Sequence, residues 1–131
     1  YDRSIVLMCN VDSTQLRFSC ATGLEPKFLA LAENLRLDVN IESSDPRKLS
    51  NVFRLGNSVL IPDVKEHLKI LADRQSSDLL SHSHSKSFVA VPIRTVGNTY
   101  GILIADCYKT DRVMNEDDCT LLTTIGKQLA M

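Results

Sequence analysis

The stretch that decides the fold lies at residues 88–107 and reads FVAVPIRTVGNTYGILIADC. Two apolar runs flank a short polar joint containing Gly97, a composition typical of a tight turn between antiparallel strands. We expect strands over 87–93 and 99–107, lying side by side in opposite directions. Because Pro92 has no N–H to donate to a ladder, its position must face a sheet edge or a bulge.

A second hairpin is predicted at the start of the chain. Residues 4–9 form a continuous apolar run, and residues 15–21 alternate apolar and polar side chains. The joint between them, NVDST, is rich in the residues that turns prefer. Since two hairpins supply most of the strands, we expect an α+β fold with a mainly antiparallel sheet rather than a doubly wound parallel sheet.

The middle of the chain mixes helical and strand patterns. Short strands are predicted over 36–41 and 58–63. One helix is predicted over 26–35, and a second begins at the cap Asp45-Pro46 and ends at Gly56. A third helix is predicted from Val64 to Ala72. The Ser- and His-rich residues 81–87 read as a solvated polar loop. A final helix should begin at Asn115, followed by three acidic residues where the helix dipole favours them. Its apolar stripe is Leu121, Leu122, Ile125 and Leu129.

Length and charge narrow the function classes. The 131 residues make one domain without a linker, and 15 Lys plus Arg nearly balance 16 Asp plus Glu. We therefore expect no nucleic-acid partner and no direct membrane contact. No apolar run approaches the roughly 20 residues needed to span a bilayer. The start at Tyr1 and the end inside a predicted helix at Met131 suggest a piece of a longer protein.

Four cysteines lie at positions 9, 20, 107 and 119, and none forms a Cys-x-x-Cys pair. The first three lie within or at the ends of apolar runs, where cysteine behaves as a small hydrophobe. We expect reduced structural thiols of a cytosolic protein, with a disulfide or redox role as the alternative.

Four motifs in a fixed order carry a family resemblance. They are SIVLMC with QLRFSCATGL, then NVFRLGNSVLIPDV, then FVAVPI with GNTYGILIAD, and finally NEDDCTLLTTIGKQLA. In this order they resemble the GAF domain family over nearly the whole chain, 1–131. The resemblance implies a central antiparallel sheet with helices on both faces, in which AVPI is a usual strand form. It also implies a helix before the first strand, which this chain lacks.

The resemblance implies a role in signalling. GAF domains occur in histidine kinases, cyclases, phosphodiesterases and transcriptional activators, where they sense a small molecule or hold a dimer. The sequence is therefore interpreted as a non-catalytic sensory or regulatory domain of a cytoplasmic bacterial protein, such as a two-component system. It would form a homodimer through its terminal helices. The alternative is a ligand-free dimerisation module of such a protein.

Six residues are candidates for contact with a small-molecule ligand, and each has a structural alternative. His82 and His84 form a His-x-His pair that could face one metal or border a pocket, but a metal site needs further ligands. Asp63 suits a helix cap as well as a ligand contact. Phe53 and Phe88 fit a place in the core better than a place in a ligand-binding wall. The full set is Phe53, Asp63, His67, His82, His84 and Phe88.

Several chemistries find no support in the sequence. There is no cysteine between positions 20 and 107, where the family's covalent tetrapyrrole sites have one, and the five glycines form no phosphate-binding loop. The sulfoxide reductases of the family use loop cysteines, whereas we expect three of these cysteines in strands and Cys119 in a helix. We predict no enzymatic activity and no metal site, and the cofactor remains unassigned.

Overall fold

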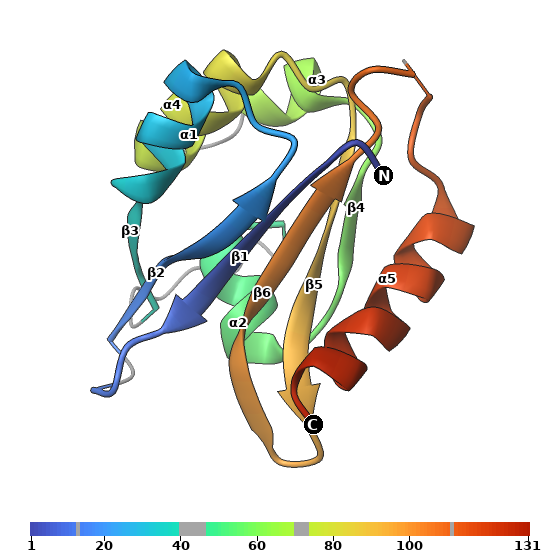
Figure 1. Cartoon of the computed structure of the whole chain (residues 1–131). Coiled ribbons are helices and arrows are strands. Elements are labelled where there is room, and N and C mark those ends of the chain that lie inside the picture. The colour runs from blue at the N-terminus through green and yellow to red at the C-terminus, as the bar shows by residue number, and fades with distance from the viewer. Residues whose placement is uncertain (13, 40–46, 70–73, 111) are drawn as a thin grey trace.

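The computed structural model describes residues 1–12, 14–39, 47–69, 74–110 and 112–131. Within these residues the strands form a six-stranded antiparallel sheet in the order β3-β2-β1-β6-β5-β4 (Figure 1). The strands are β1 (Arg3–Cys9), β2 (Gln15–Thr22), β3 (Arg36–Asp38), β4 (Val59–Ile61), β5 (Phe88–Thr95) and β6 (Asn98–Asp106).

The hairpin predicted from residues 88–107 is confirmed. Strands β5 and β6 pair antiparallel, and Gly97 in the turn has a left-handed φ of 90°. Pro92 lies two residues beyond Ala90, the last β5 residue in register with β4, and just before a register shift between Ile93 and Arg94. The proline thus occupies the edge-and-bulge setting that its missing N–H requires.

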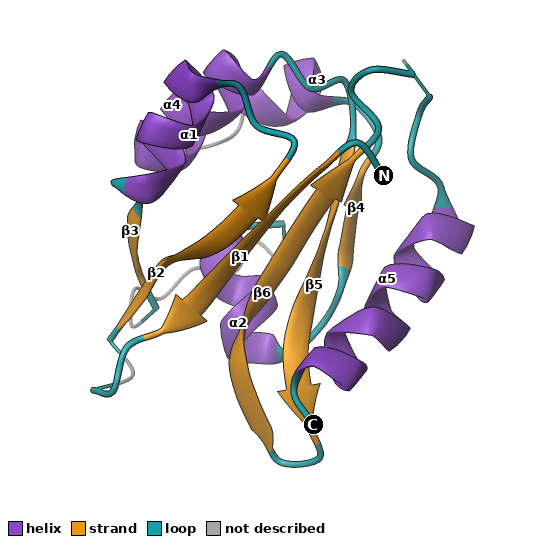
Figure 2. Ribbon diagram, viewed as in Figure 1, coloured by secondary structure: helices purple, strands orange, loops and turns teal. Residues whose placement is uncertain are grey.

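Helices cover both faces of the sheet, as Figure 2 shows. One apolar core lies between the sheet and α1 (Pro26–Glu33), α2 (Leu49–Leu55), α3 (Val64–Leu68) and α4 (Arg74–Ser83). The other core lies under α5 (Glu116–Leu129) and contains Val91, Leu103 and Leu122. The expected α+β arrangement is therefore confirmed. None of the helices among the described residues is both long and apolar enough to cross a bilayer.

The middle segment differs from the prediction at its helix ends. Helix α2 begins at Leu49 with Lys48 at the cap position, whereas the predicted cap Asp45-Pro46 lies outside the described residues. The predicted stop is confirmed, since Gly56 takes a left-handed φ of 72°. Strand β3 ends at Asp38, and positions 40 and 41 of the predicted strand are not described. Likewise α3 ends at Leu68, and positions 71 and 72 are not described.

Helix α4 corrects the predicted loop at 81–87. The helix continues through Ser83, so His82 lies on helical backbone. Leu79 and Leu80 are both buried in the core, which anchors one side of this polar helix. Two adjacent leucines are too short an apolar signal to show a helical period, so tertiary burial decides the structure here.

Helix α5 begins as predicted but buries less of its stripe. The Asn115 side chain accepts from the Asp118 backbone N–H, and the Asp118 side chain accepts from the Asn115 N–H, which completes a capping box. Leu122 is buried, whereas Leu121 and Leu129 are 52% and 54% exposed. The predicted apolar stripe is therefore only partly a core face.

Candidate functional site

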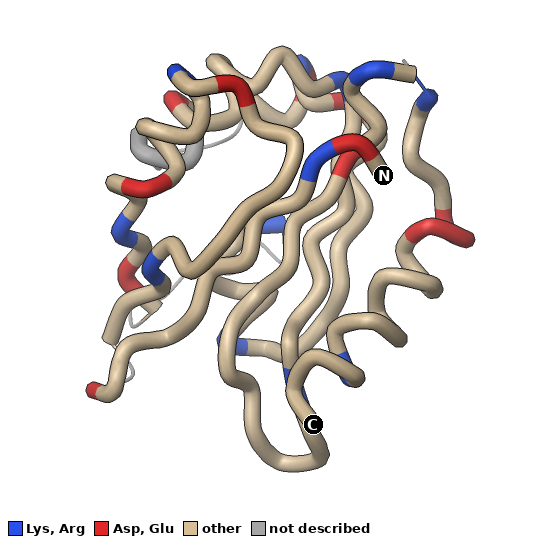
Figure 3. The backbone as a smooth tube through the Cα atoms, viewed as in Figure 1, with Lys and Arg blue, Asp and Glu red and all other residues tan. Residues whose placement is uncertain are grey.

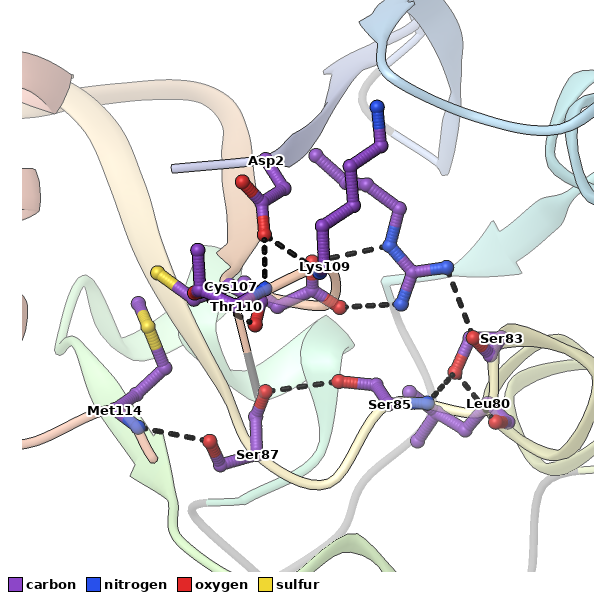
Figure 4. A network of polar contacts seen from close by, with 11 residues as sticks. Asp2, Leu80, Ser83, Ser85, Ser87, Cys107, Lys109, Thr110 and Met114 are labelled. Carbon is purple, nitrogen blue, oxygen red and sulfur yellow. Dashed lines mark hydrogen bonds and ion pairs between the residues drawn. The ribbon is translucent and has the colours of Figure 1, made fainter. Parts of the chain in front are cut away.

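A buried ion pair joins β1 and β6, which are neighbouring strands in the middle of the described sheet. The Arg3 guanidinium donates from Nε to Asp106 Oδ1 at 3.0 Å and from Nη2 to Oδ2 at 2.6 Å. Its Nη1 donates to the Ser83 carbonyl oxygen of α4 at 2.8 Å, within the network of Figure 4. Both charged residues are only 7% exposed. Such a two-point geometry fixes the guanidinium in one orientation.

Two aromatic rings enclose the same guanidinium. Its central carbon lies 5.2 Å from the ring centroid of Phe28 in α1 and 4.1 Å from that of Tyr108, which follows β6. Cation–π attraction is strongest where the charge is shielded from water, as it is for Arg3. One side chain therefore ties together the sheet, both helices α1 and α4, and the start of the connection to α5.

A small cavity lies beside this ion pair, between the sheet and helices α1 and α4. Its volume is about 30 Å³, which accommodates one or two water molecules. Apolar side chains make most of its wall, and Arg3, Asp106 and the Ser83 and Ser85 residues supply polar atoms at one side. The apolar lining residues are Ile5, Leu24, Phe28, Leu49, Leu79, Leu80, Phe88, Ile104 and Ala105.

A larger groove opens to the surface between α3 and the end of α4. It measures about 530 Å³, and its lining includes Asp63, Leu68, Leu80 and His84. Asp63 caps α3, since its carboxylate accepts a hydrogen bond from the Glu66 N–H at 3.3 Å. Leu80 and Ser85 line both the groove and the cavity beside the ion pair, so these two residues lie between the two spaces.

The structure brings together some of the candidate residues proposed from the sequence. Phe88 is 2% exposed and forms part of the cavity wall, and the His67 ring packs edge-on against it with 6.0 Å between centroids. Asp63 and His84 share the groove between α3 and α4. Phe53 packs against the core from α2 and is not part of the cavity wall.

The two histidines of the His-x-His pair point into different surroundings. The His82 ring nitrogen lies 2.8 Å from the Asp78 carbonyl oxygen on the exposed side of α4. His84 follows the helix with a left-handed φ of 54° and lines the groove. Among the described residues, no three His, Cys, Asp or Glu side chains gather closely enough to hold a metal ion.

A second charged cluster fastens the start of α5. The Arg112 guanidinium donates to both oxygens of Asp118, at 2.9 and 3.0 Å, and the Tyr1 hydroxyl donates to Asp118 Oδ1 at 2.9 Å. The hydrogen bond from Arg112 lowers the pKa of Asp118 to about 2. Burial, reinforced by Asp118, raises the pKa of Tyr1. Burial also raises the pKa of Cys119 one position further along the helix.

The site residues predicted from the sequence do not include Arg3, Asp106, Tyr108 or Arg112. The only available signal was a charged residue at the end of each of two apolar runs, Arg3 before one and Asp106 near the end of another. Adjacent antiparallel strands place such ends together, here with Arg3 directly opposite Asp106 in the register. A pairing across 103 positions is invisible without the strand order.

Comparison with known proteins agrees with this fold. The family model described as GAF domain matches residues 1–131. The chain belongs to the GAF domain family. A comparison of this GAF domain with curated protein sequences gave no significant match.

Solved structures resemble this GAF domain over almost its whole length. Residues 122 to 287 of a methyl-accepting chemotaxis protein share 22% identity and a TM-score of 0.72, covering 99% of this chain and 76% of that one. The second GAF domain of DevS from Mycobacterium smegmatis shares 15% identity and a TM-score of 0.65, covering 98% of this chain and 77% of that one. A type II free methionine-R-sulfoxide reductase from Thermoplasma acidophilum shares 19% identity and a TM-score of 0.65, covering 99% and 76%. Similarity at this level establishes the fold.

Proposed function

We propose that this GAF domain is a non-catalytic sensor of a small molecule within a cytoplasmic bacterial signalling protein of the two-component type. The ligand would enter between the sheet and helices α1 and α4. The observation that carries this proposal is the cavity there, walled by Phe88 and by the Arg3–Asp106 pair. A hollow with apolar walls and a few convergent polar groups is the usual form of a small-molecule site.

The cavity must widen to admit a ligand. Its 30 Å³ is far below the several hundred Å³ of typical ligand pockets. Because Leu80 and Ser85 line both this cavity and the 530 Å³ groove, a shift of the end of α4 would merge the two spaces. The hydrogen bond from Arg3 to Ser83 resists that shift. A ligand that binds the widened form would stabilise it at the expense of the closed form, which is a population shift.

A thermal-shift screen of nucleotides, amino acids, haem and divalent metal ions tests this proposal. We expect one compound class to raise the melting temperature by several degrees, as binding to the native state requires. The variant Leu24→Trp, at the half-buried rim of the cavity, should abolish that shift. Leu31→Trp is the matched control, since Leu31 lies on the exposed side of α1. Equal responses of both variants would contradict binding at the cavity.

A second candidate function is ligand-free dimerisation through α5. Leu121 and Leu129 are about half exposed on this helix, with the half-buried Ile125 between them at helical spacing. A second copy would bury this apolar stripe. Sedimentation equilibrium of the double variant Leu121→Glu/Leu129→Glu should show a monomer where the unmodified chain is a dimer. Thr120→Glu, also exposed on α5, should leave the dimer intact.

A catalytic role is an alternative, because the fold of this chain resembles that of a free methionine-R-sulfoxide reductase. Cys9 and Cys20 lie in β1 and β2, Cys119 lies in α5, and Cys107 follows β6 directly. Three of these thiols therefore sit on regular elements rather than on loops, which supports the non-catalytic proposal. An assay of free methionine sulfoxide with a thiol reductant tests it. Turnover that disappears on replacing the cysteines would overturn the non-catalytic role.

A further inference from the structure

The cavity between the sheet and helices α1 and α4 has a lining whose charges cancel. Among its described lining residues, the charged ones are Arg3 and Asp106, and they neutralise each other in the buried ion pair. In Figure 3 the middle of the sheet is free of charged residues, whereas a blue and a red segment lie side by side where β1 begins and β6 ends. The described part of the wall therefore offers a ligand no unpaired charge.

We propose that this cavity accepts an uncharged aromatic ring, so that the ligand enters with an apolar end and keeps any charged group in the groove between α3 and α4. This inference rests on the proposed sensory function, because it names the chemical class of the ligand at the same site. The groove suits a charged group of either sign. Its lining includes Asp63 and Lys65, both exposed to water, where an ion keeps its hydration.

The first argument is the cost of a third charge. Arg3 and Asp106 are each only 7% exposed, and two hydrogen bonds of 3.0 and 2.6 Å join them. A charged group placed beside this pair would lose its hydration without gaining a counterion, since each member already has its partner. Burying an uncharged ring carries no such cost. The cavity therefore selects against carboxylate, phosphate and ammonium groups.

The second argument is that polar groups of the wall are already bonded within the chain. The Ser83 hydroxyl donates to the Leu80 carbonyl oxygen at 2.6 Å and accepts from the Ser85 N–H at 3.1 Å. The Ser85 hydroxyl in turn donates to the Ser87 carbonyl oxygen at 2.8 Å. A ligand that brought its own donors and acceptors would have to displace these bonds, so its net gain would be small.

The third argument is the aromatic surroundings of the cavity. Phe28 and Phe88 both line it, and ring pairs attract each other in edge-to-face and offset arrangements. A ring needs the widened form of the cavity, in which the Arg3 bond to the Ser83 carbonyl oxygen opens. The Arg3 guanidinium already lies 5.2 Å from the Phe28 ring centroid. The face of a ligand ring can meet the freed guanidinium in the same way without adding a charge.

Three single-ring compounds of nearly equal size test the inference. Benzyl alcohol is uncharged, benzoate is an anion and benzylammonium is a cation, and each is titrated at constant ionic strength into the chain with ¹³C-labelled methyl groups. We expect benzyl alcohol to give saturable shifts at the methyl groups of Ile5, Leu79 and Ile104, which line the cavity. The two ions should bind there at least about tenfold more weakly. The fully exposed Val11 and Val96 provide control methyl groups that should show no saturable shift.

A charge variant gives a second readout. Asp106→Asn keeps the shape of the side chain but leaves the Arg3 charge without its counterion, so benzoate should bind at least about tenfold more tightly than to the unmodified chain. Asp117→Asn removes a carboxylate from the exposed side of α5 and should leave the order of the three compounds unchanged. If Asp106→Asn does not fold, the order of the three compounds on the unmodified chain decides alone.

The outcomes separate this inference from the proposed function. Benzoate or benzylammonium binding at the cavity as tightly as benzyl alcohol would overturn the inference and leave the sensory function standing. The same holds for an unchanged benzoate affinity in folded Asp106→Asn. A lack of saturable shifts with benzyl alcohol also overturns the inference. The proposed function fails only if, in addition, neither ion nor any compound of the thermal-shift screen binds at the cavity.

Discussion

Gly126 of α5 packs directly on the backbone of Pro92 in β5. A Cβ atom at Gly126 would lie 2.5 Å from the Pro92 carbonyl oxygen and 3.3 Å from a methyl carbon of Val91. The glycine therefore sets how closely α5 approaches the sheet. The strand that α5 approaches here is β5, in which Pro92 has no N–H to donate to the ladder.

Replacing this glycine tests the close approach. Helix propensity alone predicts that Gly126→Ala stabilises the chain by about 1 kcal/mol. We expect the opposite, a loss of about 1–3 kcal/mol in the free energy of unfolding, because the methyl group collides with backbone that cannot move aside. Urea unfolding measures the difference. Gln128→Ala on the exposed side of α5 is the control and should change stability by less than about 0.5 kcal/mol.

The buried ion pair predicts strong coupling in a double-mutant cycle. Arg3→Met alone should cost about 3–5 kcal/mol, because it leaves Asp106 charged and buried without its partner. Adding Asp106→Leu should recover part of that loss. Urea unfolding of the unmodified chain, the two single variants and the double variant gives the coupling energy. A coupling energy of zero, which means that the two losses simply add, would contradict the prediction. The exposed pair Glu66–Lys69 provides the comparison, with expected coupling below about 1 kcal/mol.

The lowered pKa of Asp118 predicts that the folded chain loses stability in acid. Its folded pKa of about 2 lies below the ordinary value of 3.8, so its contribution is fully present above about pH 4 and declines as pH falls towards 2. Solvent screening at the half-exposed Arg112 limits this contribution to about 1–2 kcal/mol. Chemical unfolding at several pH values should show it in the unmodified chain and not in Asp118→Asn. Asp117→Asn, one exposed position away, should keep the acid sensitivity.

A pair of substitutions separates the two roles considered for Asp63. As a helix cap, Asp63→Ala should cost about 1 kcal/mol of stability, whereas Asp63→Asn should cost little because asparagine caps equally well. A ligand contact that depends on the carboxylate charge would instead be lost in both variants. Urea unfolding measures the first role, and the thermal-shift response to a bound compound measures the second.

Local signals explain what the sequence predicted correctly. Gly97 in the hairpin turn, Gly56 after α2 and Asn115 before α5 each depend on neighbours only a few residues away. The strand pattern then follows, because the apolar runs of β5 and β6 are long and joined by a short turn. These features need no knowledge of distant contacts.

The candidate site depended on distant contacts and was predicted only in part. Phe88 was proposed for its residue type alone, and its place in the cavity wall follows from the packing of α1 and α4. Arg3 gains its partners from residues 80 and 103 positions away. The helical backbone of His82 was missed because burial of Leu79 and Leu80, rather than local periodicity, stabilises α4.

The bond from Tyr1 to Asp118 has a mechanical consequence. It anchors the first residue at the beginning of α5, whereas the last residue lies at the opposite end of that helix (Figure 1). At 1.5 Å per residue, the 14-residue helix separates these two points by about 21 Å. Tension applied between the two ends in a single-molecule stretching experiment would therefore load α5 lengthwise. The Tyr1 and Arg112 contacts to Asp118 should rupture before the strands shear apart.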